Sequence, residues 1–494
     1  MIRQLAAWTQ NWKLILTLAL PSIISFASGT VTGTINLMMV GGMGALVIAV
    51  VGVSNIIAYN AWALCSGFGH SVNYLVAQNY GAGQMDQAVR RTYIALYVGL
   101  AAAVLAVLTG WLAPGLILRA MGGSPELVAA GGSYLMYRLY AVACFTLSFI
   151  LHGFFRGIGD TRTPMVMTIA ANVAMIFFTY TLTYGRWGFP ELGLSGAGLA
   201  VLIGEALGLL GSAYVYFVRL NGRYGTRRRV TVDRGEASLI LAESGKLGMQ
   251  ELAMSLAMFV FTMFVTRLGT EALAANEIAL NVMGLGFMPA FGFGATATIL
   301  VGQEIGRGNP LGARRMAGDV AVLGSLFLLV LGTAELVFST EVARLYTQDQ
   351  AVYELAGRLI MASAYLQLFD GLLNYYAGGL RGLGDTTFLL RVSLILNWPA
   401  LRSAGLRPDL YGGPWEHGRL VLALCLPGRL RRGPVHPVLP HRLVFGYGQA
   451  ESGPRRLKKA ACSLCPRQAS ASAAEVLCVL PCGLKEFTEK HRIM

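Results

Sequence analysis

Carboxylates inside otherwise apolar stretches are the residues of this sequence best able to do chemistry. Asp370 lies in "YLQLFDGLLNYYAGGLRG", and Glu251 and Glu277 lie in two other apolar stretches. Burying an ionised side chain in hydrocarbon is costly, so each of the three is a candidate for cation coupling. A desolvated Asp can take up a proton, or it can stay ionised beside Na⁺ with oxygen ligands from its neighbours. The sequence leaves proton and sodium open.

Polar residues at helical spacing surround Asp370. Gln367, Asn374 and Tyr375 lie about one helical turn from it and would complete a polar face. In the first half of the chain, Asn36 and Asn172 lie inside apolar stretches. An amide can bind a cation or a drug but does not change its protonation at useful pH. We expect these five residues to line a substrate cavity, and hydrogen bonding between helices is the alternative role for the two asparagines.

Composition identifies the elements that must position these residues. The chain has 494 residues, of which 55% are hydrophobic and only 13% charged, with a mean hydropathy of +0.57. Apolar runs long enough to cross a bilayer recur along the first four-fifths of it, which predicts an all-α integral membrane protein. The predicted spans are 13–40, 45–77, 92–113, 133–155, 164–184, 194–218, 248–266, 272–302, 318–338 and 357–378, and an eleventh begins near Phe388.

The distribution of charge predicts the topology. The formal net charge is +14, but the arginines of the membrane part fall mainly in alternate loops, for example at 90–91, 156–162, 219–234 and 307–315. Such loops face the cytoplasm. We therefore expect a multi-pass protein of the cell membrane with a cytoplasmic N-terminus, and no binding of nucleic acid.

The chain contains an internal repeat with an offset of 225 residues. "VAQNYGAGQMDQAVRR" from Val76 aligns with "VGQEIGRGNPLGARR" from Val301, and "RGIGDTRTP" from Arg156 aligns with "RGLGDTTFL" from Arg381. Several blocks at one spacing indicate a tandem duplication of a six-span unit. An even number of spans gives both copies the same orientation, as in transporters whose two halves rock against each other. The predicted domains are an N-lobe at 1–220, a basic cytoplasmic linker at 221–247 and a C-lobe at 248–397.

The repeated RGxGD phrase itself is predicted to be a turn. Its glycines permit positive φ, and its Asp can cap the helix that follows. A phosphate-binding loop is not expected, because the GxGxxG context of such a loop is absent.

The quoted motifs, together with "TINLMMVGGMG" (Thr34–Gly44) and "LGTEALAANEIALN" from Leu268, resemble the multidrug and toxic compound extrusion (MATE) family over residues 1 to about 397. The resemblance implies twelve helices in two six-helix lobes, and export of organic cations coupled to protons or sodium ions. We expect no other cofactor, and action as a monomer in the bilayer. Asp370 matches the family's cation-binding Asp. Glu251 is displaced by a few residues from the family's acid in the seventh helix, and Asn36 stands where many relatives have Asp.

Residues 398–494 depart from this plan. The duplication predicts two more spans there, but the segment is rich in Pro and Arg and contains no run of 18 apolar residues. We interpret it as an aberrant polar tail, either read out of frame or disordered. Cys462, Cys465, Cys478 and Cys482 have a zinc-like spacing, but we expect no metal site in such a tail.

Other functions are disfavoured. A lipid-linked oligosaccharide flippase of the same superfamily would need a strongly basic central cavity, whereas Arg and Lys are nearly absent from the middle of the spans. An enzyme is not expected and no catalytic residue is assigned, because the six histidines are scattered. A truncated transporter that no longer works is the remaining alternative.

The frame hypothesis can be tested on the nucleotides alone. We expect one of the other two reading frames downstream of codon 397 to encode two further hydrophobic spans. The hypothesis fails if neither frame does.

Overall fold

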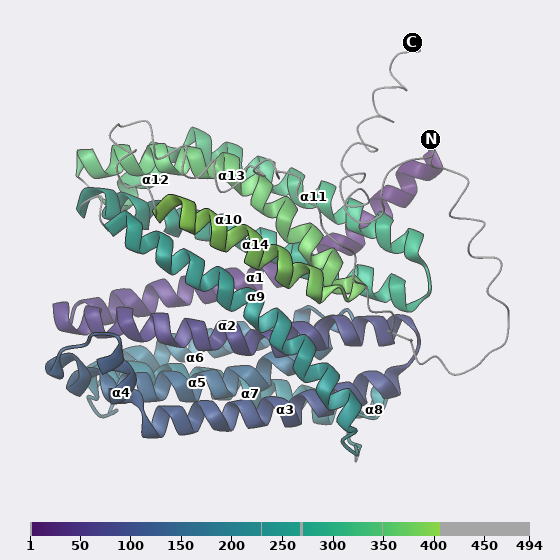
Figure 1. The fold of residues 1–494 in the computed structure, drawn as a ribbon, viewed down its shortest axis with the longest axis horizontal. Coiled ribbons are helices and arrows are strands. Elements are labelled where there is room, and N and C mark those ends of the chain that lie inside the picture. The colour runs from purple at the N-terminus through teal and green to yellow at the C-terminus, as the bar shows by residue number, and fades with distance from the viewer. Residues whose placement is uncertain (1, 229, 267–269, 348, 406–494) are drawn as a thin grey trace, which may run out of the picture. The chain divides into compact units, whose positions relative to one another are not determined.

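The computed structural model describes residues 2–228, 230–266, 270–347 and 349–405, and this part consists of helices joined by short turns, with no strand in it (Figure 1). The predicted all-α class is confirmed. The first half contains α1 (Ile2–Gly41), α2 (Ala45–Gly81), α3 (Met85–Leu112), α4 (Pro114–Ala120), α5 (Pro125–Gly157), α6 (Arg162–Tyr184), α7 (Gly193–Tyr214) with its π-helical extension η1 (Val215–Arg219), and α8 (Asn221–Tyr224). The second half contains α9 (Arg234–Thr266), α10 (Thr270–Gly306), α11 (Pro310–Val337), α12 (Ser339–Tyr346), α13 (Gln350–Leu383) and α14 (Thr386–Gly405).

Eight helices of the described part are long and apolar enough to cross a membrane: α1, α2, α3, α5, α6, α7 with η1, α10 and α11. Large apolar side chains on their outer faces are exposed, such as Trp111 (67%), Leu112 (70%) and Val330 (73%). Such side chains are suited to lipid contact. The predicted span in α13 falls outside this set, because Asp370 and its polar neighbours lie near the middle of that helix.

The two halves use equivalent contacts. In the first half α5 packs closely on α2, and a Cβ atom added to Gly153 would lie 2.4 Å from the carbonyl oxygen of Gly69. In the second half α13 packs on α10, and a Cβ atom added to Gly378 would lie 2.1 Å from the carbonyl oxygen of Gly294. Both residues of the second pair are 225 positions beyond those of the first. The repeat is therefore present in the packing as well as in the sequence.

Helices α1 and α9 connect the halves. A Cβ atom on Gly67 of α2 would lie 2.5 Å from the amide nitrogen of Gly248 in α9, and one on Gly292 of α10 would lie 3.0 Å from the amide nitrogen of Ile23 in α1. These two contacts are again related by the offset of 225. Figure 1 shows both helices crossing between the halves.

Two equivalent hydrogen bonds join the halves at one end of the bundle. The side-chain amide of Gln78 donates to the carbonyl oxygen of Gly382 at 2.8 Å, and that of Gln303 donates to the carbonyl oxygen of Gly157 at 3.0 Å. We call this end, formed by the turns at 82–84, 158–161, 220–233, 307–309 and 384–385, the basic end. The halves are thus bonded to each other there by both copies of one motif.

The helices approach most closely at the same level. A Cβ atom on Gly81 would lie 2.0 Å from the carbonyl oxygen of Gln303, and one on Gly306 would lie 1.9 Å from that of Gln78. Only glycine permits this contact without moving the backbone.

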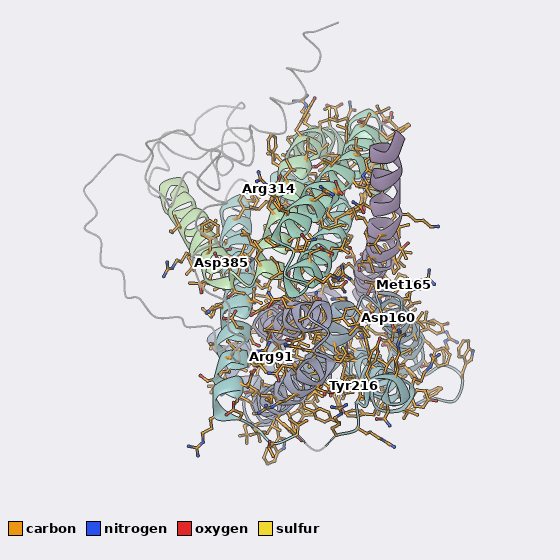
Figure 2. The ribbon with its side chains drawn as sticks, turned by 90° about the vertical axis from the view of Figure 1, so that its right-hand side faces the viewer. Arg91, Asp160, Met165, Tyr216, Arg314 and Asp385 are labelled. Atoms are coloured by element: carbon orange, nitrogen blue, oxygen red, sulfur yellow. The ribbon has the colours of Figure 1, made fainter. Side chains whose placement is uncertain are left out.

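The repeated RGxGD phrases form turns, as predicted. Gly159 and Gly384 have φ values of +88° and +87°. Asp160 and Asp385 each accept a hydrogen bond from the amide three residues later, at 3.0 and 3.1 Å. Figure 2 views the basic end and labels both aspartates, one from each half.

The linker between the halves is shorter than the predicted segment 221–247. Helix α9 begins at Arg234, because the polar residues that mark the segment pack against the first half. Arg91 of α3 forms an ion pair with Glu236 at 3.0 Å, and Tyr74 of α2 donates to Glu243 at 2.9 Å.

Of the predicted tail, only residues 398–405 are described, and they continue α14 past Pro399. The remainder, including the four cysteines with zinc-like spacing, lies outside the described residues.

The glycine contacts at the basic end can be tested directly. Gly81→Ala and Gly306→Ala each place a methyl group against a backbone carbonyl, and overpacking of this kind costs about 1–3 kcal/mol. We expect both variants to lower thermal stability and to lengthen the distance between spin labels at Gln84 and Leu311.

Gly52→Ala is the matched control, because a Cβ atom on Gly52 of the same α2 would meet nothing within 4 Å. Equal behaviour of the control and the two variants would show that these glycines do not hold the halves together.

Candidate functional site

Asp370 lies on α13 and is half-buried. The helix begins where the Asp349 side chain accepts hydrogen bonds from two backbone amides, and it ends at Gly384 in the left-handed conformation. One turn beyond Asp370, the side-chain amide of Asn374 donates to its carboxylate at 3.0 Å and to its backbone carbonyl at 3.0 Å. The predicted polar face therefore includes a direct contact between these two residues.

Gln367 lies one turn before Asp370 and is 3% exposed. It packs against Gly286 of α10, where a Cβ atom would lie 2.3 Å from the side-chain nitrogen of Gln367. Glu335 of α11 is 8% exposed and lies beside Gln367 without a well-formed hydrogen bond. Neither side-chain atom of Gln367 has a hydrogen-bond partner among the described residues, nor does one carboxylate oxygen of Glu335.

Tyr375 completes this group of polar side chains. It is 1% exposed, and its ring fits against two glycines, Gly324 of α11 and Gly371 of its own helix. Its hydroxyl lacks a hydrogen-bond partner among the described atoms and is near enough to Asp370 for electrostatic interaction. Buried polar groups without partners are rare, and each needs an explanation.

These side chains can serve as cation ligands. Asp370, Asn374, Gln367, Tyr375 and Glu335 supply carboxylate, amide and hydroxyl oxygens, and such oxygens suit a hard cation or a proton shared with a carboxylate. Helices α11 and α13 hold them within one half of the protein, and Gly286 of α10 packs against Gln367. Sequence reasoning ranked Glu335 below the other acids, because its place near the end of a predicted span gave no sign of its burial against α13.

Glu251 does not join this site. Its carboxylate accepts a hydrogen bond from Arg381 at 3.0 Å, in an ion pair whose side chains are 18% and 14% exposed. Arg381 is 11 residues beyond Asp370 on α13, a rise of about 16 Å. The structure therefore places Glu251 near the basic end, with a cationic partner of its own.

The equivalent position in the first half carries no acid. Phe26 lies 225 residues before Glu251, as Arg156 does before Arg381. Arg156 is 4% exposed and lies over the rings of Phe26 and Phe149, at 5.1 and 5.3 Å from their centroids. No carboxylate of the described residues is within ion-pair distance of it. Cation–π contact takes the place of the ion pair.

His70 of α2 lies near both arginines. Sequence reasoning did not single out Arg156 or His70. The offset of 225 could have identified Arg156, because it pairs this residue with Arg381 and Phe26 with Glu251.

The other predicted residues lie apart from Asp370. Glu277 of α10 is exposed, and its backbone carbonyl accepts a hydrogen bond from Asn281. Asn172 of α6 donates to Ser28 of α1 at 2.9 Å, which is the interhelical role considered as the alternative. Asn36 of α1 has a buried side-chain oxygen without a partner among the described atoms. The structure thus joins Asp370 to Asn374 and places Tyr375 near it, leaves Gln367 one turn away beside Glu335, and leaves Glu251, Glu277, Asn36 and Asn172 elsewhere.

Comparison with known proteins supports this architecture. The MatE family profile matches residues 21–181 and 247–400. The chain is 30% identical over 410 residues to a probable multidrug resistance protein NorM of Rhizobium meliloti, covering 80% of this chain and 85% of that protein. It is 28% identical over 390 residues to the multidrug resistance protein PmpM of Pseudomonas aeruginosa, covering 78% and 81%.

Solved structures share the fold. One, described as the outward-facing conformation of a multidrug resistance MATE family transporter of the MOP superfamily, superposes with a TM-score of 0.75 at 22% identity, covering 84% of this chain and 92% of that one. A second, a MATE protein in complex with MaL6, gives a TM-score of 0.76 at 21% identity with the same coverage. Since the family profile matches both copies of the repeat, this chain is a member of the MatE family of membrane transporters.

Proposed function

We propose that the protein is an antiporter that exports organic cations and drugs across the cell membrane in exchange for protons or sodium ions. The names of its relatives support drug export, since they are multidrug resistance proteins. The observation that carries the proposal is the Asp370 site. It is a carboxylate inside a membrane lobe, bonded to Asn374 and near the unpartnered hydroxyl of Tyr375, and no basic side chain of the described residues forms an ion pair with it.

Competition for one carboxylate would couple the two fluxes. When Asp370 is ionised, it attracts an organic cation. When a proton or Na⁺ occupies it, that attraction is lost and the cargo leaves. Because each ligand weakens the binding of the other by the same factor, a gradient of the small ion can drive the cargo outward.

Alternating access is the second part of the proposal. The positive-inside distribution of arginines supports a cytoplasmic N-terminus and so a cytoplasmic basic end. The bonds of Gln78 and Gln303 and the glycine contacts then correspond to an arrangement closed on the cytoplasmic side. Breaking them would open the site to the cytoplasm.

The flippase alternative receives less support. It would need several uncompensated basic groups lining one cavity, whereas Arg381 is paired with Glu251. A transport assay on this chain also decides whether it is a working transporter or a truncated one.

Asp370→Asn tests the coupling residue. The amide has the size of the carboxylate but cannot bind a proton or attract a cation as strongly. In everted membrane vesicles with an imposed proton or sodium gradient, we expect drug accumulation by this variant to fall to the level of vesicles that lack the protein.

Glu277→Gln is the matched control. It removes one acid from an exposed position of the same half, and we expect it to transport normally. Undiminished gradient-driven accumulation by Asp370→Asn would exclude this residue as the coupling acid.

Glu251→Gln is expected to act on stability. It leaves Arg381 unpaired in a largely buried position, and the loss of one partner of a buried pair costs about 3–5 kcal/mol. We expect a lower melting temperature for Glu251→Gln, and recovery of most of the loss in the double variant Glu251→Gln/Arg381→Gln.

The coupling role that the sequence predicted for Glu251 is tested by the same variants. That role would hold if the single variant kept its melting temperature but lost transport, and if the double variant did not recover transport.

A further inference from the structure

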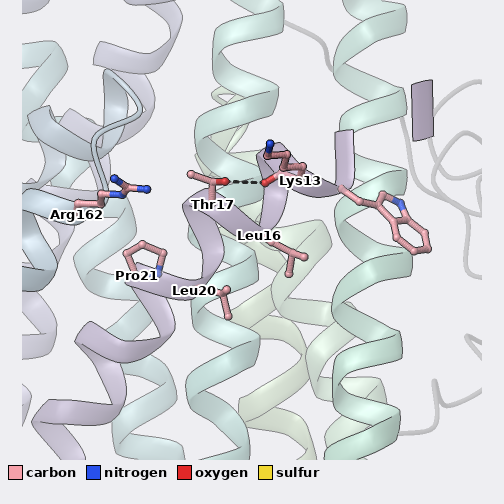
Figure 3. Close-up of a pocket in the computed structure, with 7 residues that line it drawn as sticks. Lys13, Leu16, Thr17, Leu20, Pro21 and Arg162 are labelled. Atoms are coloured by element: carbon pink, nitrogen blue, oxygen red, sulfur yellow. Dashed lines mark hydrogen bonds between the residues drawn. The ribbon is translucent and has the colours of Figure 1, made fainter. Parts of the chain in front are cut away.

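A groove lies along the first turns of α1, beside the start of α6. It has a volume of about 570 Å³ and is lined by Trp12, Lys13, Leu16, Thr17, Leu20, Pro21 and Arg162. Figure 3 shows Lys13 and Arg162 on either side of Thr17, above the apolar side chains. The groove is open to the surroundings of the helices and does not involve Asp370.

Its lining combines positive charge with an apolar floor. Lys13 and Arg162 are exposed, neither forms an ion pair with a described residue, and no acidic residue lines the groove. The Thr17 hydroxyl donates to the carbonyl oxygen of Lys13 at 2.7 Å and is therefore satisfied. Leu16, Leu20 and Pro21 continue from the charged residues toward the middle of the span. A ligand that fits has an anionic group joined to a long apolar part.

The depth of the groove along the membrane spans indicates that its ligand comes from the bilayer. The span of α1 begins at Asn11 and that of α6 at Arg162. Lys13 and Arg162 therefore lie where apolar helix meets the polar boundary, at the depth of lipid phosphates. Basic pockets between membrane helices at this depth bind anionic headgroups.

The groove also lies at a junction between the two halves. The opposite face of α1 packs on the second half, where Ile15, Leu18 and Ala19 form one hydrophobic cluster with Ala290 and Phe293. Arg162 belongs to α6 of the first half. A ligand bonded to Lys13 and Arg162 would therefore join α6 to the part of α1 that packs on the second half, at the end where the halves are closed.

The repeat shows that the fold does not require these two cations. The equivalents of Lys13 and Arg162, 225 residues later, are Ser238 and Thr387. Residues that join the halves, such as Gln78 and Gln303, occur in both copies of the repeat. The pair Lys13 and Arg162 occurs in the first copy only. We take this as support for a ligand-binding role.

We propose that the groove binds an anionic phospholipid, with its phosphate between Lys13 and Arg162 and an acyl chain along Leu16 and Leu20, and that the bound lipid favours the arrangement closed at the basic end. A ligand shifts such an equilibrium when it contacts one arrangement better than the other. The binding of lipid does not depend on which cargo the protein transports.

The binding test uses the full chain in phosphatidylcholine nanodiscs with increasing phosphatidylglycerol, and native mass spectrometry of the lipid retained on the protein. We expect retention of phosphatidylglycerol over phosphatidylcholine, and a loss of at least about tenfold in that preference in Lys13→Gln/Arg162→Gln. The control Arg227→Gln/Arg234→Gln removes the same charge from exposed positions outside the groove and should keep the preference. Asp370→Asn should keep it too, so that lipid binding and ion coupling are tested separately.

Three results would overturn the lipid site. The first is equal retention of phosphatidylcholine, which would mean an unselective apolar surface. The second is full displacement by inorganic phosphate, which would mean a site for a free anion. The third is an unchanged preference in Lys13→Gln/Arg162→Gln.

The conformational part has its own measurement, the distance between spin labels at Gln84 and Leu311 in vesicles of phosphatidylcholine with and without phosphatidylglycerol. We expect phosphatidylglycerol to increase the short-distance population in the unsubstituted protein and in the Arg227→Gln/Arg234→Gln control, but not in Lys13→Gln/Arg162→Gln. An equal response of all three proteins, or no response in any, would refute this part.

Discussion

Two hydrogen bonds related by the repeat hold the halves of this protein together at the basic end, from Gln78 to the carbonyl of Gly382 and from Gln303 to the carbonyl of Gly157. They form because glycines at this level let the backbones of α2 and α10 touch. An amide that bonds a backbone carbonyl across two helices needs that close approach, and it gives directional bonding where lipid offers none. The crossing helices α1 and α9 and the contacts between the halves all depend on this register.

The repeat also places an arginine at the equivalent position of each half, and the two arginines have different partners. Arg381 is paired with Glu251, whereas Arg156 lies over Phe26 and Phe149. The ionisable residues of the candidate site also differ between the two halves. The equivalents of Asp370 and Asn374 in the first half are Phe145 and Phe149, whose rings stack at 5.0 Å. Duplication preserved the packing positions, while the ionisable site exists in one copy only.

Much of this was predictable from residue types and spacing. Helical periodicity placed Gln367, Asn374 and Tyr375 around Asp370, and the offset of 225 predicted two equivalent bundles. Contacts between helices distant in sequence were not predictable, because periodicity gives the face of a helix but not the neighbour that covers it. Glu251 was therefore assigned to the wrong surroundings, and the burial of Glu335 against α13 was missed.

The division between the halves has an electrostatic consequence along α13. Under the proposed function, a cation at Asp370 would meet the carboxylate, the side chain of Asn374 and the hydroxyl of Tyr375. Further toward the basic end, Arg381 is paired with Glu251, whereas Arg156 has no carboxylate of the described residues within ion-pair distance. Guanidinium groups inside the low dielectric of a membrane protein strongly raise the energy of another cation. Under the proposed function, Asp370 would attract a cation at mid-depth and the arginines beyond it would repel the same ion, so that the glycine contacts and the arginines would oppose leakage by different physical means.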